Sequence, residues 1–284
     1  MKTSVIISTY NEPAWLEKVL WGYAAQTRGD FQMVVADDGS GAETAEVVER
    51  ARPAFGGRLL HVWHEDLGYR KCEILNRAIV ASSGDYLVFS DGDCLPRADF
   101  VAVHAGLARA GRFLSGGALR LPMGTSRRIA EEDVRTGRAF RAGWLARNEW
   151  EPARHRVRLL PNTPLAAALD SLTPTRASWN GGNASTWREV VLRVNGYDNT
   201  MKYGGQDRAL GERLENMGVP GMQVRHRAVL LHLEHARPYR TDESIRRNRE
   251  IRDGIRATRS ARTPDGIAEL GADTGLRIDG VPAR

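Results

Sequence analysis

Short apolar runs that alternate with helical patterns constrain the fold of this chain more than any other feature. Val, Ile, Leu and aromatic residues are concentrated at residues 4–8, 31–36, 59–63 and 86–90. Helical patterns fill the gaps: Pro13 suits a first helical turn, and Leu16, Val19 and Leu20 then recur on one face. This order is typical of βαβ units. We therefore predict an α/β fold with a mostly parallel central sheet flanked by helices.

The length of 284 residues suits one α/β domain with a terminal extension. No internal repeat and no linker divides the chain. We predict a single domain over residues 1–239, followed by a basic tail over residues 240–284. In the second half, residues 186–194 have a helical pattern.

The net charge of +6 favours an anionic partner such as nucleic acid, an acidic membrane or a phosphorylated substrate. Residues 240–262 contain eight Arg against four acids, so the tail is the best place for peripheral membrane contact. A solvated, partly helical tail is the alternative. Two cysteines are too few for a disulfide framework, and no apolar run reaches the ~20 residues of a membrane span. These features favour a cytoplasmic protein.

Polar and acidic residues follow three of the apolar runs, where ligands of parallel sheets bind. Asp91 and Asp93 follow the fourth run with one glycine between them. Two carboxylates suit Mg²⁺ or Mn²⁺, and such an ion can bridge them to a diphosphate. The alternative is ordinary turn chemistry, in which Asp and Gly are common.

Asp38 follows the second run and could accept a hydrogen bond from a base or a ribose, with Tyr10 stacking on the base. A turn carboxylate and a half-buried aromatic residue are the alternative explanations. Each motif is ambiguous when it is considered alone.

The joint order of residues 8–12, 37–40, 70–77 and 90–93 resembles family 2 glycosyltransferases of the GT-A fold. The resemblance covers about the first 120 residues, the expected nucleotide-binding half, and leaves residues 121–239 as the acceptor and catalytic half. It implies a nucleoside-diphosphate sugar donor, most often a UDP-sugar, bound across the strand ends. The donor-binding residues that it implies are Thr9, Tyr10, Asn11, Glu12, Asp38, Arg70, Asp91 and Gly182.

The second half is similar to the C-terminal region shared by β-1,4-galactosyltransferases and bacterial chondroitin-type polymerases. The similarity lies in residues 181–185, 194–198 and 203–207, where those proteins usually carry Trp-Gly-Gly-Glu-Asp and this chain has Tyr203 and Gln206. It implies that Asp207 acts as general base on the acceptor hydroxyl, with inversion at the anomeric carbon. Gln206 leaves the acceptor preference of the family in question. A structural role for Asp207 at a helix N-terminus is the alternative.

His232 resembles the family histidine that completes the metal site beside Asp93. Neutral imidazole is a reasonable ligand next to carboxylates. His235 lies three residues further on, and the register of the motif favours His232.

These features together predict an inverting, metal-dependent glycosyltransferase that uses Mn²⁺ or Mg²⁺. It would move a hexosyl or N-acetylhexosaminyl group from a UDP-sugar to a carbohydrate or another hydroxyl acceptor. One alternative is a sugar nucleotidyltransferase, although residues 8–12 lack the expected glycine-rich loop. A nucleotide-binding relative with weak or no activity is another alternative. We expect no nucleic-acid partner, because RNA-binding and zinc-finger motifs are absent and acidic strand ends would repel phosphate.

Overall fold

The computed structural model describes residues 1–148, 157–160, 163–236, 239–272 and 275–280. The strands are β1 (Thr3–Thr9), β2 (Phe31–Asp37), β3 (Leu59–Trp63), β4 (Tyr86–Asp91), β5 (Cys94–Pro96), β6 (Phe113–Ser115), β7 (Gly117–Arg120), β8 (Asn183–Trp187), β9 (Gly221–Gln223), β10 (Val229–His232) and β11 (Arg277–Asp279). The helices are α1 (Pro13–Ala24), α2 (Ala42–Ala51), α3 (Lys71–Ala81), α4 (Phe100–Leu107), α5 (Met123–Arg128), α6 (Glu131–Arg135), α7 (Ala142–Arg147), α8 (Pro164–Leu172), α9 (Arg188–Arg193), α10 (Gln206–Asn216) and α11 (Asp242–Thr258), with 3₁₀ turns η1 (Arg52–Phe55), η2 (Arg138–Phe140) and η4 (Ile267–Glu269). None of these helices is long and apolar enough to cross a bilayer.

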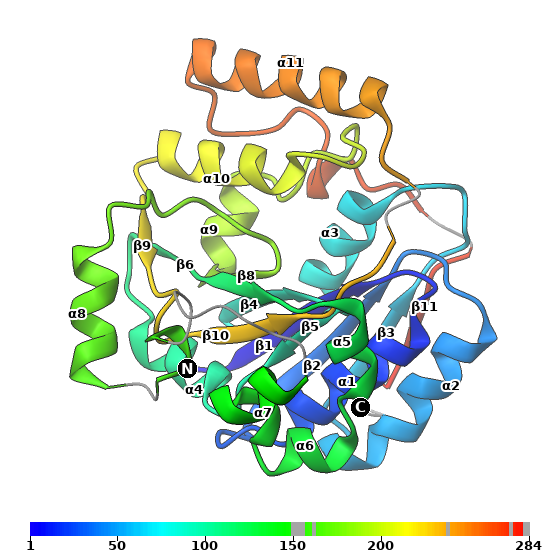
Figure 1. Ribbon diagram of the computed structural model, residues 1–284. Helices are drawn as coiled ribbons and strands as arrows, with labels where there is room; N and C mark the ends of the chain where they lie inside the picture. Colours follow the sequence, from blue (N-terminus) through cyan, green and yellow to red (C-terminus); the bar gives the residue numbers. More distant parts are fainter. Residues whose placement is uncertain (149–156, 161–162, 237–238, 273–274, 281–284) are drawn as a thin grey trace.

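The central sheet has the order β11-β3-β2-β1-β4-β8-β6-β9 (Figure 1). Strands β3, β2, β1 and β4 are parallel neighbours, as predicted from the alternation of runs and helices. Strands β8 and β11 are antiparallel to their neighbours β4 and β3. The predicted α/β fold is confirmed.

Both faces of the parallel strands are buried, because helices cover each of them. In β1, Val5 and Ile7 face one apolar cluster with α1, α2 and α4, while Ile6 faces another with α3, α9 and α10. All seven residues of β1 are buried. This burial on both faces explains why the strands read as continuous apolar runs in the sequence.

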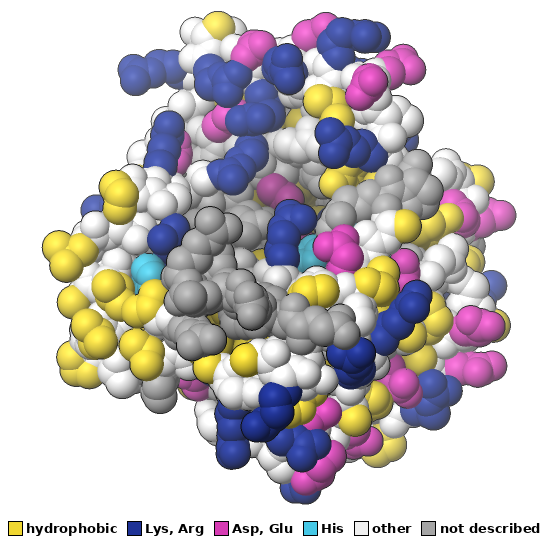
Figure 2. Space-filling view, viewed as in Figure 1, with side chains coloured by type: hydrophobic (Ala, Val, Ile, Leu, Met, Phe, Trp, Pro, Cys, Tyr) yellow, Lys and Arg dark blue, Asp and Glu magenta, His cyan; other side chains and the backbone are white. Residues whose placement is uncertain are grey.

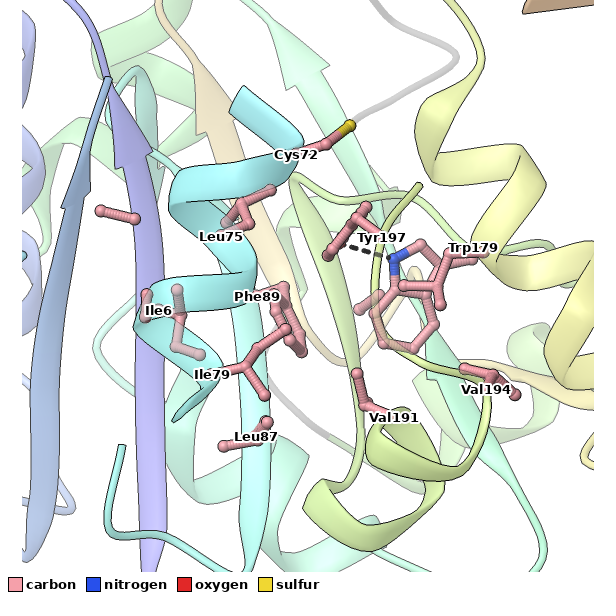
Figure 3. Packing of buried hydrophobic residues seen from close by; sticks show 14 of the residues in the cluster. Ile6, Cys72, Leu75, Ile79, Leu87, Phe89, Trp179, Val191, Val194 and Tyr197 are labelled. Atoms are coloured by element: carbon pink, nitrogen blue, oxygen red, sulfur yellow. Dashed lines mark hydrogen bonds between the residues drawn. The ribbon is translucent and has the colours of Figure 1, made fainter. Parts of the chain in front are cut away.

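Trp179 is the largest side chain at the centre of the cluster beneath α3, α9 and α10 (Figure 3). It is fully buried, its ring lies edge-on to Phe89 at 5.4 Å between centroids, and its Nε1 donates to Tyr197 Oη at 3.2 Å. Truncation of such a side chain to alanine typically costs about 3–5 kcal/mol. This packing fixes the chain immediately before Gly181 and Gly182, which reach the carboxyl ends of the strands.

A second, smaller sheet has the order β5-β10-β7. Strand β10 is antiparallel to β5, so that His232 pairs with Cys94, the residue after Asp93. The pairing explains how two segments almost 140 residues apart come together.

The predicted helix over residues 186–194 is shorter in the structure. Thr186 and Trp187 belong to β8, where they pair with Leu87 and Tyr86 of β4, and α9 begins at Arg188. Backbone hydrogen bonds to β4 therefore outweigh the local helical pattern of these two residues.

The expected basic tail contains α11, which packs on α10 at the top of the molecule (Figure 1). Thr241 caps α11 by accepting a hydrogen bond from Ser244 N, and Asp242 and Glu243 lie in its first turn. Lys and Arg side chains gather over this helix (Figure 2). Further on, β11 joins the edge of the central sheet beside β3. The division at residue 239 stays a prediction.

Candidate active site

A cavity of about 700 Å³ opens at the carboxyl ends of β1, β2 and β4. It is lined by Ser8, Thr9, Tyr10, Asn11, Glu12, Asp38, Gly68, Tyr69, Lys71, Asp91, Gly92, Asp93, Cys94, Ala118, Arg120, Asn180, Gly182, Tyr203, Gln206, Asp207, Arg208, His232, His235, Ala236 and Tyr239. These residues come from segments that are far apart in the sequence, from the end of β1 to the segment that precedes α11. The structure brings all the predicted site residues except Arg70 to this cavity.

Arg70 is not among the residues that line the cavity. Its guanidinium donates to Glu65 O at 2.5 Å and to Glu73 Oε2 at 3.4 Å. Its backbone contacts a cavity residue, because Arg70 N donates to Asp38 Oδ2 at 3.1 Å. The contact between the Arg70 side chain and a donor stays a prediction.

Asp38 is nearly buried and is held by two donors. His64 Nε2 lies 2.8 Å from Asp38 Oδ1, and the amide of Arg70 occupies the other oxygen. Burial raises the pKa of Asp38, although the hydrogen bond to His64 opposes this shift. The carboxylate is thus fixed in orientation at the end of β2.

Tyr10, by contrast, is 42% exposed at the edge of the cavity. Its hydroxyl donates to Asp66 Oδ2 at 2.8 Å, which holds the ring beside the end of β2. An exposed ring in this position is available for stacking on a flat ligand.

Asp91 forms the centre of a charged network at the end of β4. Its Oδ1 accepts hydrogen bonds from Ser8 Oγ at 2.8 Å and from Lys71 Nζ at 2.7 Å. Burial disfavours the Lys71 ammonium, but Asp91, Tyr69 and Asp207 outweigh that effect and hold the pKa of Lys71 well above its usual value. Lys71 is therefore a fixed positive charge inside the cavity.

Asp93 lies between two histidines. Its Oδ2 is 2.7 Å from His235 Nε2 and 3.6 Å from His232 Nε2, and the two imidazole rings are stacked with an interplanar angle of 19°. Burial alone would raise the pKa of Asp93, but the hydrogen bond from His235 and the charges of both histidines hold it at about 2. His235, which the register of the motif did not favour, is thus the nearer of the two.

One carboxylate and two imidazoles match the ligand chemistry of a divalent transition metal. One potential ligand atom from each of Asp93, His232 and His235 lies within 4.8 Å of the other two. Glu12 borders this group, and burial raises the pKa of Glu12 with a further contribution from Asp93. Asp93, His232 and His235 fit a divalent metal ion.

Asp207 occupies the first turn of α10, and Gly204 and Gly205, two glycines with φ near +100°, precede this helix. The position is crowded, because a Cβ at Gly181 would overlap the Asp207 carboxylate. A Cβ at Gly182 would lie 3.0 Å from Asp91 Oδ2. Gly181 and Gly182 therefore lie between the carboxylates of Asp207 and Asp91. Glycine is required here for close approach of the backbone.

The electrostatics of Asp207 suit a base. Burial and the negative charge of Asp91 raise its pKa to about 6, while Lys71 and Arg208 act in the opposite direction. Its Oδ1 is buried and has no hydrogen-bond partner among the described residues. A carboxylate with one unpartnered oxygen and a pKa just below neutrality can accept a proton from a bound hydroxyl.

Several cavity residues were not predicted from the sequence, above all Tyr69 and Lys71. Both follow β3, whose carboxyl end lies at the same edge of the sheet as those of β1, β2 and β4. The signal that could have found them is this position after the third apolar run.

Comparison with known proteins agrees with this geometry. The model of the family described as glycosyl transferase family 2 matches residues 4–153, more than half of the chain. Validoxylamine A glucosyltransferase of Streptomyces hygroscopicus subsp. jinggangensis (strain 5008) is 31% identical over 255 residues, which are 85% of this chain and 57% of that protein. The chain spans about half the length of the curated relatives that it matches in this way.

Solved structures show the same fold at low sequence identity. The mannosyltransferase PcManGT from Pyrobaculum calidifontis, in complex with GDP-Man and Mn²⁺, has a TM-score of 0.57 at 20% identity, over 93% of this chain and 66% of that one. S. aureus TarS 1-349 in complex with UDP-GlcNAc has a TM-score of 0.56 at 15% identity, over 84% of this chain and 60% of that one. These neighbours are GT-A glycosyltransferases, and with the match of the family model we conclude that this chain belongs to glycosyl transferase family 2.

Proposed function

We propose that this protein transfers a sugar from a nucleoside-diphosphate donor to an acceptor hydroxyl, with inversion at the anomeric carbon. The observation that carries the proposal is the meeting of Asp91, Asp93 and Asp207 in one cavity at the strand ends. A metal-binding group and a base are the two devices that this chemistry needs. Membership of the family supports the reaction class.

Donor binding is assigned to the strand ends of the nucleotide-binding half. Tyr10 and Asp38 face the base, Asp91 faces the ribose, and Thr9, Asn11 and the Gly182 backbone complete the wall. Uracil is the base that we propose first. Guanine is the competing choice, because one structural neighbour holds GDP-Man.

A divalent ion, Mn²⁺ or Mg²⁺, would be held by Asp93 with His235 and His232. When bound, it would supply positive charge for the diphosphate leaving group. Glu12 adds negative charge beside this group, so an anionic donor would meet repulsion from the protein alone. Lys71, whose Nζ lies 2.7 Å from Asp91 Oδ1, offsets part of this charge from inside the cavity.

Asp207 is assigned the role of base. Its carboxylate, which lines the cavity, would accept the proton of the acceptor hydroxyl, and the oxygen of that hydroxyl would form the new bond to the anomeric carbon as the bond to the diphosphate breaks. Because Gly181 and Gly182 have no side chain, the carboxylates of Asp207 and Asp91 lie close to the backbone of this segment.

Donor screening tests the proposal. Purified protein would be incubated with Mn²⁺ and a panel of UDP- and GDP-sugars that includes the glucosyl donors, and nucleoside diphosphate release would be measured with and without chelator. We expect release from one donor class that depends on the metal. Binding of nucleotide without turnover would favour a relative that only binds nucleotide, and pyrophosphate-dependent formation of a nucleotide sugar would favour a nucleotidyltransferase.

A further inference from the structure

Three tyrosine rings form an aromatic cluster on the wall of the cavity that contains Asp207. Tyr69 lies 6.3 Å from Tyr203 and 5.7 Å from Tyr239 between ring centroids, and Tyr203 lies 4.9 Å from Tyr239. All three rings line the cavity. Aromatic rings supply rigid apolar contact area, and the few polar groups among them set the orientation of a ligand.

Gln206, the residue before Asp207, determines whether the Tyr69 hydroxyl donates or accepts in the hydrogen bond between these two side chains. The backbone N–H of Gly204 can only donate, and it lies 3.0 Å from Gln206 Oε1, which fixes the amide oxygen on that side. The amide nitrogen therefore faces Tyr69 and donates to Tyr69 Oη at 3.1 Å. Because an amide N–H cannot accept, the Tyr69 oxygen is the acceptor of this bond.

The direction of this bond leaves the Tyr69 proton pointing elsewhere. Among the described residues, no other hydrogen bond to Tyr69 Oη is formed, and the half-buried ring borders the cavity. Burial, joined by the negative charge of Asp207, keeps the pKa of Tyr69 well above its usual value, so the phenol stays protonated. Tyr69 thus presents an O–H donor to whatever occupies the space beside Asp207.

The loop that carries this arrangement is itself fixed from behind. Asn248 of α11 is fully buried, and its Nδ2 donates to Lys202 O at 2.8 Å and to Gly204 O at 3.0 Å. Lys202 Nζ in turn donates to Tyr69 O at 2.9 Å. The Gly204 amide and the Tyr69 ring are therefore held in fixed positions relative to each other, as an oriented donor requires.

We propose that Tyr69 donates a hydrogen bond to an oxygen of a carbohydrate acceptor, and that Gln206 is the positioning residue that sets the direction of that bond. The inference rests on the proposed function, since the acceptor must lie next to Asp207. A Glu at position 206 would accept from both Gly204 N and Tyr69 O–H. The proton would then be turned away from the acceptor.

The test is a double-mutant cycle with the full chain, Mn²⁺ and the donor that the wild type turns over. p-Nitrophenyl glycosides of glucose, galactose, mannose and N-acetylglucosamine are the acceptor probes. Tyr69→Phe keeps the ring and removes the proton, so the KM for the acceptor should rise about three- to tenfold, as expected for one hydrogen bond, while the KM for the donor moves less than twofold. Gln206→Glu should raise the acceptor KM similarly, and the double variant should be no worse than either single variant.

Gln32→Glu is the matched control. It makes the same change of charge on β2, next to Ser4 at the opposite end of the sheet, and it should leave the acceptor KM unchanged. Additive effects of Tyr69→Phe and Gln206→Glu, or a rise in the donor KM alone, would overturn the inference while the proposed function stands. Transfer to none of the glycosides by a wild type that hydrolyses its donor would overturn the carbohydrate acceptor. Absence of any donor turnover would instead remove the proposed function itself.

Discussion

Asp207→Asn is the most informative single change, because it keeps the shape of the side chain and removes the basic oxygen. Burial and the charge of Asp91 raise the pKa of Asp207 to about 6. About nine in ten molecules then carry the ionised base at pH 7 and about one in ten at pH 5. We therefore expect the kcat/KM of the wild type to fall about tenfold between pH 7 and pH 5. The substitution itself should lower transfer by about 10²- to 10⁴-fold at pH 7.

The same shift in the pKa of Asp207 predicts that ionisation of this carboxyl group, which activity requires, lowers the stability of the folded chain. The carboxyl group of Asp207 binds its proton more tightly in the folded chain, with a pKa of about 6, than in the unfolded chain, where it is about 3.9. Stability from this group is therefore present below pH 4 and is lost as the pH rises to 6. At pH 7 Asp207→Asn should increase the free energy of unfolding, by at most about 3 kcal/mol and by less because the carboxylate borders an open cavity.

The assay combines pH-dependent kinetics with urea denaturation of both proteins. A variant that is more stable and much less active separates loss of the base from loss of folding. Full transfer activity in Asp207→Asn would refute the assignment. Glu12, another acid that lines the cavity, would then be a candidate for the base.

Three further changes test the surroundings of the site. Asp93→Ala should abolish the Mn²⁺-dependent increase in UDP affinity, because it removes the carboxylate at the centre of the histidine pair; calorimetry with and without chelator measures this, and an unchanged increase would exclude a metal role for Asp93. Asn248→Ala removes two hydrogen bonds to the loop before Asp207 and should lower the free energy of unfolding, measured by urea titration, by about 1–3 kcal/mol. An unaltered urea midpoint would mean that α11 does not hold the loop. A chain that ends at Arg262 loses the hydrogen bonds of residues 263–269 with Asn195 and Asn199 and should melt at a lower temperature by calorimetry, whereas an equal melting temperature would show that this segment is dispensable.

The sequence by itself determined the parallel part of the sheet. Residues in β1 to β4 are buried on both faces, so the apolar pattern was strong and local, and four strands were placed almost to the residue. It also indicated the acidic residues at three strand ends, because parallel topology places these ends at one edge. Asp38, Asp91 and Asp93 could therefore be assigned to one site before the structure was known.

Other features of the fold and of the site were determined only by the tertiary structure. Thr186 and Trp187 form a strand because β4 offers them a partner, which a local pattern does not encode. His235 approaches Asp93 more closely than His232, and this order depends on the path of the chain after β10.

Lys71 and Tyr69 acquire their roles only through contacts with distant parts of the chain. The ammonium of Lys71 meets Asp91, twenty residues away, and the hydroxyl of Tyr69 meets Gln206, more than a hundred residues away. Periodicity in a sequence reports which face of an element is buried, since that depends on neighbours three or four positions away. The direction of a hydrogen bond and the pKa of a carboxylate depend instead on atoms that only folding brings within a few ångströms, and for that reason they could be obtained only from the three-dimensional arrangement.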